Sequence, residues 1–176
     1  MSTLTVQNIQ GSSSSGNTIT VASGHVIHQP GSVIQFQHVN FSDTTTITTT
    51  GTNYTDVTGA TISITPKFTS SKIFILTDLS NYASRSGTYV YSGIRIVRGS
   101  STVVSPLSMS DGNGPYDYGV NDANQHDTRK NITAYDAPNT TSAVTYKIQA
   151  AMYAGGQIVF NHTTGTSNLF AMEIAQ

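Results

Sequence analysis

The side chains best suited to recognition chemistry gather in one polar stretch of the sequence, residues 107–131. This stretch mixes Tyr, Asn and His with scattered Asp, and Tyr brings a large contact area with a polar tip at low entropy cost. Such a mixture is typical of recognition surfaces and suits stacking on sugar rings. The alternative is a solvated loop that packs against a neighbouring subunit. The candidate contacts to a glycan are Asn113, Tyr116, Tyr118, Asn121, Asn124 and His126.

The sequence predicts neither a metal site nor a cofactor. Between Asp111 and Asp117 oxygen-bearing side chains alternate faintly as in a calcium loop, but Pro115 takes the third acidic position and no Glu closes the loop. His25 and His28 are three residues apart in a strand-like segment, so their side chains point to opposite faces. One of them could meet its copies on the axis of a trimer, but an exposed or hydrogen-bonded histidine is the favoured interpretation.

The sequence also predicts no enzymatic activity. It contains no Gly-x-Ser-x-Gly elbow, no Walker loop and no His-Glu-x-x-His pair. The single glutamate, Glu173, lies in the last predicted strand, so a pair of catalytic carboxylates would need loop aspartates. A glycan depolymerase is therefore the least favoured of the functional hypotheses.

The composition is that of an all-β protein with hydroxyl-covered faces. Charged residues make up 10% of the chain, against about 25% in an ordinary globular protein. The 9 Tyr and 6 Phe, with many Thr, Val and Ile, suit pleated, half-buried surfaces. A net charge of −1 without a basic stripe disfavours nucleic-acid binding, and the absence of Cys excludes disulfides. No apolar run is long enough for membrane insertion, and the first residues lack the pattern of a secretory signal.

Short strands separated by turn signals run through the chain. In residues 61–79, Ile62 and Ile64 alternate with polar residues, Pro66 ends that strand, and residues 72–76 form an apolar run that fits a strand covered on both faces. Further strands are expected at 33–41, 42–52, 88–91, 93–97 after a bulge or bend, 102–105, 132–135, 144–152, 158–160 and 169–174. Polar loops are expected at 53–59, 80–87, 107–131 and 161–168.

The last strand should be buried, with Phe170, Met172 and Ile174 on one face. No stretch keeps a period of 3.6 residues, so almost no helix is expected. Many short strands with regular turn signals predict an all-β domain, a β-sandwich or a jelly roll, over residues 33–176.

Residues 1–32 differ from the rest, because they contain no charged side chain and only short strand-like pieces interrupted by Gly and Ser. We interpret them as an extended N-terminal docking and oligomerisation arm that becomes ordered by pairing with other chains; a flexible linker is the alternative. The apolar residues that would carry this assembly are Leu4, Val6, Ile9, Ile19, Val21, Val26 and Ile27.

Several pieces of the sequence resemble tailed-phage virion surface proteins, the small fibre, spike and decoration modules. The pieces are ITPKF with SSKI at 64–73, GIRIVRG at 93–99, DAPNTTSAVTY at 136–146 and the ending MEIAQ. They span the predicted sandwich, while the arm resembles particle-docking N-termini more loosely. The resemblance implies a jelly-roll-like domain on a virion, expected as a homotrimer, and it implies no catalytic residues.

Two functional hypotheses follow for a non-enzymatic virion protein that is made in a host cytoplasm and released by lysis. In the first, the arm binds other virion proteins and the outward β knob is a fibre- or spike-type attachment protein for host surface glycan, with avidity from many copies. In the second, the chain is a capsid decoration protein, a head fibre or cement protein that braces capsomers. The sequence alone leaves both open.

Overall fold

The computed structural model describes residues 14, 16, 22, 27, 29–48, 53–85, 90–104, 116–117, 125–152 and 156–176. These residues form twelve β-strands and no α-helix, which confirms the predicted all-β class. Within this part of the chain there is no helix long and apolar enough to cross a membrane. The strands are β1 (Val33–Phe41), β2 (Thr45–Ile47), β3 (Thr55–Ile64), β4 (Lys72–Arg85), β5 (Val90–Arg98), β6 (Ser101–Val104), β7 (Tyr116–Asp117), β8 (Gln125–Lys130), β9 (Thr133–Asp136), β10 (Val144–Met152), β11 (Gly156–Phe160) and β12 (Ser167–Ile174).

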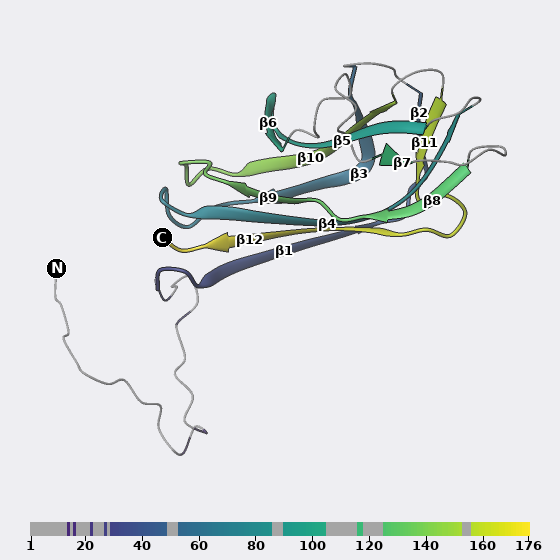
Figure 1. Cartoon of the computed structure of the whole chain (residues 1–176). Coiled ribbons are helices and arrows are strands. Elements are labelled where there is room, and N and C mark those ends of the chain that lie inside the picture. The colour runs from purple at the N-terminus through teal and green to yellow at the C-terminus, as the bar shows by residue number, and fades with distance from the viewer. Residues whose placement is uncertain are drawn as a thin grey trace.

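The strands form two antiparallel sheets that pack as a sandwich. One sheet has the order β1-β12-β4-β11-β2, and β8 and β9 also pair with β4. The other has the order β3-β10-β5-β6, and β7 pairs with β5. Figure 1 shows the two layers, with β1, β12 and β4 side by side in one and β3 and β10 in the other.

The pairing is nested, and this nesting identifies a jelly roll. The first strand pairs with the last, β3 pairs with β10, β4 with β9, and β5 with β6. Successive pairs fall in alternate sheets, so the two four-strand sets are β1-β12-β4-β9 and β3-β10-β5-β6. A long hairpin wound in this way into a double sheet is the jelly-roll arrangement. The predicted jelly-roll-like sandwich is therefore confirmed.

The core between the sheets comes from strict alternation along the strands. In β4, Ile73 and Ile75 point inward and are completely buried; in β10, Tyr146 and Ile148 do the same from the opposite sheet. Phe160 of β11 is also fully buried in this cluster.

Strand β4 corrects the sequence prediction at its second half. Residues 80–87 were expected to form a polar loop, but β4 continues to Arg85 because it has a partner on each edge there, β11 on one side and β8 on the other. Asn81, Tyr82 and Ala83 are buried by these neighbours. A polar sequence is thus held in a ladder by its two flanking strands.

Three further expectations are corrected. Residues 125–130, expected within a loop, form β8, and residues 55–59, expected as a turn, belong to β3. In both places a polar segment becomes a strand because a partner strand satisfies its backbone. The bulge or bend expected near Gly93 is also wrong, since Ser92 and Gly93 keep regular register with Met152 and Ala151 of β10.

The structure decides which face of β12 meets the other sheet. Phe170, Met172 and Ile174 share one face as predicted, but this is the outer face, where they are only half-buried. The inward face of β12 carries Leu169 and Ala171 instead, both fully buried. The strand is central, between β1 and β4, so the predicted strand and the shared face are confirmed, and the structure adds which face is inward.

A polar clamp joins the two sheets. The Tyr146 hydroxyl of β10 donates to Asp136 Oδ2 of β9 over 2.7 Å, and Arg98 Nε of β5 donates to the same oxygen over 2.7 Å. Burial of the phenol, together with the hydrogen bond to the carboxylate, raises the pKa of Tyr146 far above its usual value. Tyr146 therefore stays a neutral donor, and the clamp fixes β9 over β10 and β5.

Glu173 is a structural residue rather than a catalytic one. It is completely buried on the inward face of β12, and its Oε1 accepts hydrogen bonds from the backbone N–H groups of Lys67 (2.7 Å) and Phe68 (3.3 Å). These two residues lie in the turn after Pro66, so the carboxylate ties the connection between β3 and β4 to the last strand.

The chain enters the sandwich beside its own C-terminus. Gly31 N donates to Ala175 O over 2.8 Å, and Ala175 N donates to Ser32 O over 3.0 Å. Of the residues expected to carry assembly through the arm, Ile27 is described and its side chain is 60% exposed. The others, Leu4, Val6, Ile9, Ile19, Val21 and Val26, lie outside the described residues, so the arm stays a prediction.

We predict that Tyr146→Phe lowers the free energy of unfolding by about 1–2 kcal/mol, because the ring still fills the core while the hydrogen bond to Asp136 is lost. Asp136→Ala should cost more, about 2–4 kcal/mol, because it leaves the buried hydroxyl and the Arg98 guanidinium without their acceptor. Urea denaturation measures both. Ser63→Ala, which removes an exposed hydroxyl pair with Thr145, is the matched control and should change stability by less than about 0.5 kcal/mol. Equal losses in the three variants would contradict the clamp.

Candidate functional site

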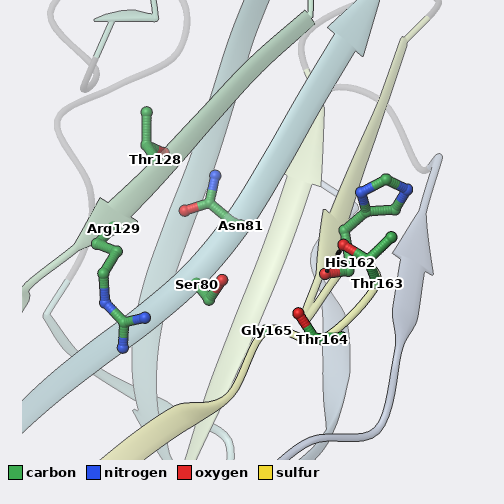
Figure 2. A pocket seen from close by; sticks show the side chains of 8 residues that line it. All are labelled: Ser80, Asn81, Thr128, Arg129, His162, Thr163, Thr164 and Gly165. Atoms are coloured by element: carbon green, nitrogen blue, oxygen red, sulfur yellow. Dashed lines mark hydrogen bonds between the residues drawn. The ribbon is translucent and has the colours of Figure 1, made fainter.

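The described surface is hollowed on the outer face of the seven-stranded sheet, where β4, β8 and the loop 161–166 meet (Figure 2). The hollow is shallow, with a volume of about 350 Å³. Ligand pockets span about 300–1,000 Å³, so this one suits a small group such as one unit of a larger ligand. Its lining residues are Ser80, Asn81, Thr128, Arg129, His162, Thr163, Thr164 and Gly165.

Asn161 positions the loop that forms one wall of this hollow. Its backbone is left-handed, with a φ of 53°, a conformation that Asn tolerates better than most residues. Its N–H donates to Ser80 O of β4 over 3.0 Å, and its side-chain Nδ2 donates to Phe41 O (3.2 Å) and Asp43 O (3.3 Å) beyond β1. The side chain is buried, so these hydrogen bonds fix the loop to β1 and β4.

A second set of contacts closes the Asn161 network. Ser167 Oγ, completely buried, donates to Asn161 Oδ1 over 2.6 Å and accepts from Ser80 N over 3.0 Å. Thr44 Oγ1 donates to Asn161 O over 3.1 Å. Every polar group of Asn161 is therefore satisfied, and the loop is pre-organised rather than loosely draped.

The opposite wall carries a charge-neutral ion pair. Arg129 of β8 reaches Asp78 of β4 through Nε (2.9 Å) and Nη2 (2.6 Å), and Nη2 also donates to Thr166 O over 3.3 Å. The hydrogen bond from Arg129 lowers the pKa of Asp78 below its ordinary value of 3.8. The guanidinium is partly exposed and keeps further N–H donors that a ligand could use.

An aromatic stack stands at the end of the hollow. The exposed His162 ring lies on the Tyr82 ring, with 4.9 Å between centroids and 17° between planes. The free face of the imidazole is a flat surface of the kind on which a ring can stack. Gly165 packs closely against Ser80 and Asn161, because a Cβ there would be 2.7 Å from Ser80 Oγ and 3.1 Å from the Asn161 Cα.

Asn81 and Thr128 are cross-strand partners on β4 and β8, and their polar side-chain atoms are buried. Both amide atoms of Asn81 and Oγ1 of Thr128 are buried and have no hydrogen-bond partner among the described residues. Their neighbours Ser80 and Arg129 point outward, so alternation turns these two side chains toward the interior. They border the hollow, but their polar atoms are buried in the described structure.

Chemically, the hollow offers hydrogen-bonding groups and a ring face. Among the described residues no cluster of His, Cys, Asp or Glu could hold a metal ion. The arrangement is suited to recognising a neutral, hydroxyl-rich group.

The structure describes only part of the site that the sequence predicts. Tyr116 lies in β7 and pairs with Tyr91 of β5, whereas His126 lies in β8 and pairs with Ala83 of β4. Their backbones thus belong to different sheets. Tyr118, Asn113, Asn121 and Asn124 lie outside the described residues, as do the calcium-like loop up to 115 and the histidines at 25 and 28.

The hollow was missed by sequence reasoning because its parts are far apart in the chain. Ser80 and Arg129 lie in two separate segments of the chain, and the sequence pattern predicted a polar loop at each. The usable signal was the run NHTTGTSN at 161–168, in which Asn and Gly mark a tight, non-extended loop between two apolar strands.

No protein-family model matches the chain, and no curated protein is similar to it in sequence. Solved structures with some likeness in shape are those of infectious bursal disease virus strain Gt, with a TM-score of 0.39 and 12% identity, and strain Gx, with 0.38 and 12%. T=1 particles derived from infectious bursal virus give a TM-score of 0.39 and 12% identity. Each likeness covers 90% of this chain but only 42%, 42% and 40% of the matched chains. At these scores the jelly-roll assignment rests on the strand order, and none of the three is described as a phage protein.

We expect Asn161→Ala to destabilise the protein by about 2–4 kcal/mol, because it removes three side-chain hydrogen bonds and strains a left-handed backbone. Asn161→Gly loses the same hydrogen bonds but relieves the backbone, so it should be about 1 kcal/mol milder. Chemical denaturation of the two variants separates the contributions. Equal losses would show that the positive φ contributes nothing.

The ion pair makes stability depend on pH in a defined direction. Because the pKa of Asp78 is lowered in the folded protein, its contribution is complete above the ordinary value of 3.8 and is lost as the pH falls through the lower folded value. Asp78→Asn should therefore melt at a lower temperature than wild type at neutral pH, and the gap should close in acid below 3.8. Melting curves across this range provide the measurement. A gap that persists in strong acid would mean that the charge of Asp78 is not its cause.

Proposed function

We propose that this chain is a non-enzymatic structural protein of a virus particle, displayed on the particle surface as a jelly-roll domain. The observation that carries this proposal is the nested strand order β1-β12-β4-β9 and β3-β10-β5-β6. Jelly rolls of this kind build viral capsid and lectin domains. Fold alone does not assign an activity, so the finer role is argued from the surface.

The finer proposal is an attachment protein, fixed to other virion proteins by residues 1–32, with the sandwich 33–176 facing outward. The hollow beside β8 supports it, because a sugar unit is recognised by hydrogen bonds to its hydroxyls and by contact with a flat ring. Arg129 supplies donors at the hollow and His162 supplies the ring. The ion pair with Asp78 leaves the site without net charge, which favours a neutral glycan over a phosphate or an acidic chain.

A single shallow hollow binds weakly, so attachment would depend on several copies acting together. Linked binding sites convert poor individual affinity into avidity through effective concentration. The expected homotrimer would supply this multivalency. The loop candidates Asn113, Tyr116, Tyr118, Asn121, Asn124 and His126 remain part of the proposal as a second contact region.

The alternative role is capsid decoration, and one observation favours it. Val33, Phe36 and Tyr135 are 53%, 53% and 59% exposed on the same outer face, and a protein that braces capsomers binds through buried apolar area. In that role the surface would be covered by other virion proteins, and no glycan would be bound.

We predict that immobilised full-length protein retains host-surface glycans and that Arg129→Ala with His162→Ala reduces this retention at least roughly tenfold, since the donors and the ring are both removed. Glycan-array or surface plasmon measurements read the effect. Arg95→Ala is the matched control, because Arg95 lies over the Tyr54 ring on the other outer face.

The outcomes separate the candidate roles. Loss of binding in Tyr116→Ala with Tyr118→Ala, but not in the hollow variant, would move the glycan site to the predicted loop. No glycan retention in any form, combined with immunogold labelling of capsids, would favour decoration. Absence of the protein from purified particles would overturn the proposal of a virion protein.

A further inference from the structure

Large apolar side chains cover half of the outer face of the seven-stranded sheet. In register, one row crosses four strands from Phe36 of β1 through Met172 of β12 and Phe74 of β4 to Tyr135 of β9. The next row runs from His38 through Phe170 and Leu76 to Thr133, with the His38 ring stacked on Phe170 at 4.7 Å between centroids, and Val33 and Ile174 lie at the end of the face. The residues Val33, Phe36, Phe74, Leu76, Tyr135, Phe170, Met172 and Ile174 are called the apolar strip below.

The strip places apolar side chains at outward positions, where a strand with one exposed face normally has polar ones. Outward positions of an antiparallel sheet that faces water are normally polar. In β12 the outward residues Phe170 and Met172 are larger than the inward Ala171 and Ser167. Phe36 and Phe170 add an aromatic contact, with 6.1 Å between ring centroids.

The outer face of the five-stranded sheet shows what a water-facing surface of this protein looks like. There Lys147 and Gln149 donate to Asp56 over 2.8 and 2.6 Å, and Arg95 donates to Gln149 over 2.8 Å. Ser63 and Thr145 form a hydroxyl pair beside them. The two outer faces are thus built differently, and only one is suited to permanent exposure.

Charge and geometry indicate which partner fits the strip. Lys72 stands at one end of the face, and the compensated pair of Asp78 and Arg129 stands at the other, so the strip itself is uncharged. A neutral apolar surface is complementary to a second copy of itself and has nothing to attract a charged partner. It extends to β1, the strand at the end of the sheet order.

The entry point of the chain agrees with contact between copies. The segment that precedes β1 is fixed beside the end of β12 by the hydrogen bonds of Gly31 and Ser32 with Ala175. This point adjoins Val33 and Ile174 at one end of the strip (Figure 1). Copies that met through their strips about a rotation axis parallel to β1 would bring their chain entry points together at one end.

We infer that the apolar strip is the interface between copies of this chain in a homo-oligomer. The side chains of Phe36 and Tyr135, each more than half exposed in one copy, are buried against the strip of the next. The hollow with Arg129 and His162 lies on the same face beyond the polar end of the strip. It stays at the rim of the interface, open to a ligand.

The test compares the full-length wild type with a double variant, Phe36→Asp and Tyr135→Asp, by light scattering. The wild type should have a mass that is a multiple of 18.7 kDa, and the double variant should have the mass of one chain with an unchanged circular dichroism spectrum. Thr61→Asp places the same charge on the outer face of β3 and should leave the wild-type mass intact. A wild-type mass of one chain, or a folded double variant of wild-type mass, overturns the inference.

A second measurement keeps the inference testable if the double variant fails to fold. The chain contains no cysteine, so Tyr135→Cys and Thr61→Cys each introduce one thiol. The thiol at position 135 should react roughly tenfold more slowly with an alkylating reagent than the thiol at 61, and dilution should speed its reaction as copies separate. Equal rates overturn the inference, because position 135 would then be uncovered. Protection that survives dilution to the mass of one chain also overturns it, because the chain's own N-terminal segment would then be the cover. Neither readout depends on a place on a virion.

Discussion

The position of β12 between β1 and β4 is the constraint on which the rest of the structure depends. Pairing the last strand with the first closes the nested hairpin, and pairing it with β4 places the remaining strands in the seven-stranded sheet. The same register fixes which side chains line up across the sheet, because a shift by one residue would exchange the two faces. The buried Glu173 reinforces this register by holding the turn between β3 and β4.

This register also explains why the hollow and the apolar strip fall on one surface. The inward face of β12 carries Ser167, Leu169, Ala171 and Glu173, so Phe170, Met172 and Ile174 are left on the outer face. Further along β4 the same face becomes polar, with Asp78 and Ser80 in place of Phe74 and Leu76. An apolar half and a polar half therefore adjoin on a single sheet, whereas the opposite outer face is polar throughout its described network.

Rigidity of the polar half comes from a few buried contacts. Asn161 and Ser167 connect the loop 161–166 to β1 and β4 with hydrogen bonds that water does not reach. A pre-organised loop loses little entropy when a ligand binds, which matters most for a shallow site of low affinity. The inter-sheet clamp of Tyr146, Asp136 and Arg98 acts in the same sense for the sandwich itself.

The sequence by itself determined the all-β class, a layered fold that is either a sandwich or a jelly roll, and several strands, including β1 and β10 to the residue. These follow from alternation, which is local and is not overruled by neighbours when one face is clearly apolar. Residues 80–85 and 125–130 were different, because polar strands are made by the partners that flank them and those partners are remote in sequence.

Only the tertiary structure decided which face of β12 is inside and where the hollow lies. The period-2 pattern of a strand shows that Phe170, Met172 and Ile174 share a face, but it does not show which face meets the other sheet. The hollow depends on Ser80, Arg129 and His162 coming together from three elements, and on a left-handed Asn161 held by β1, more than a hundred residues away. Such convergence is a property of the folded chain, since no local pattern encodes contacts between distant segments.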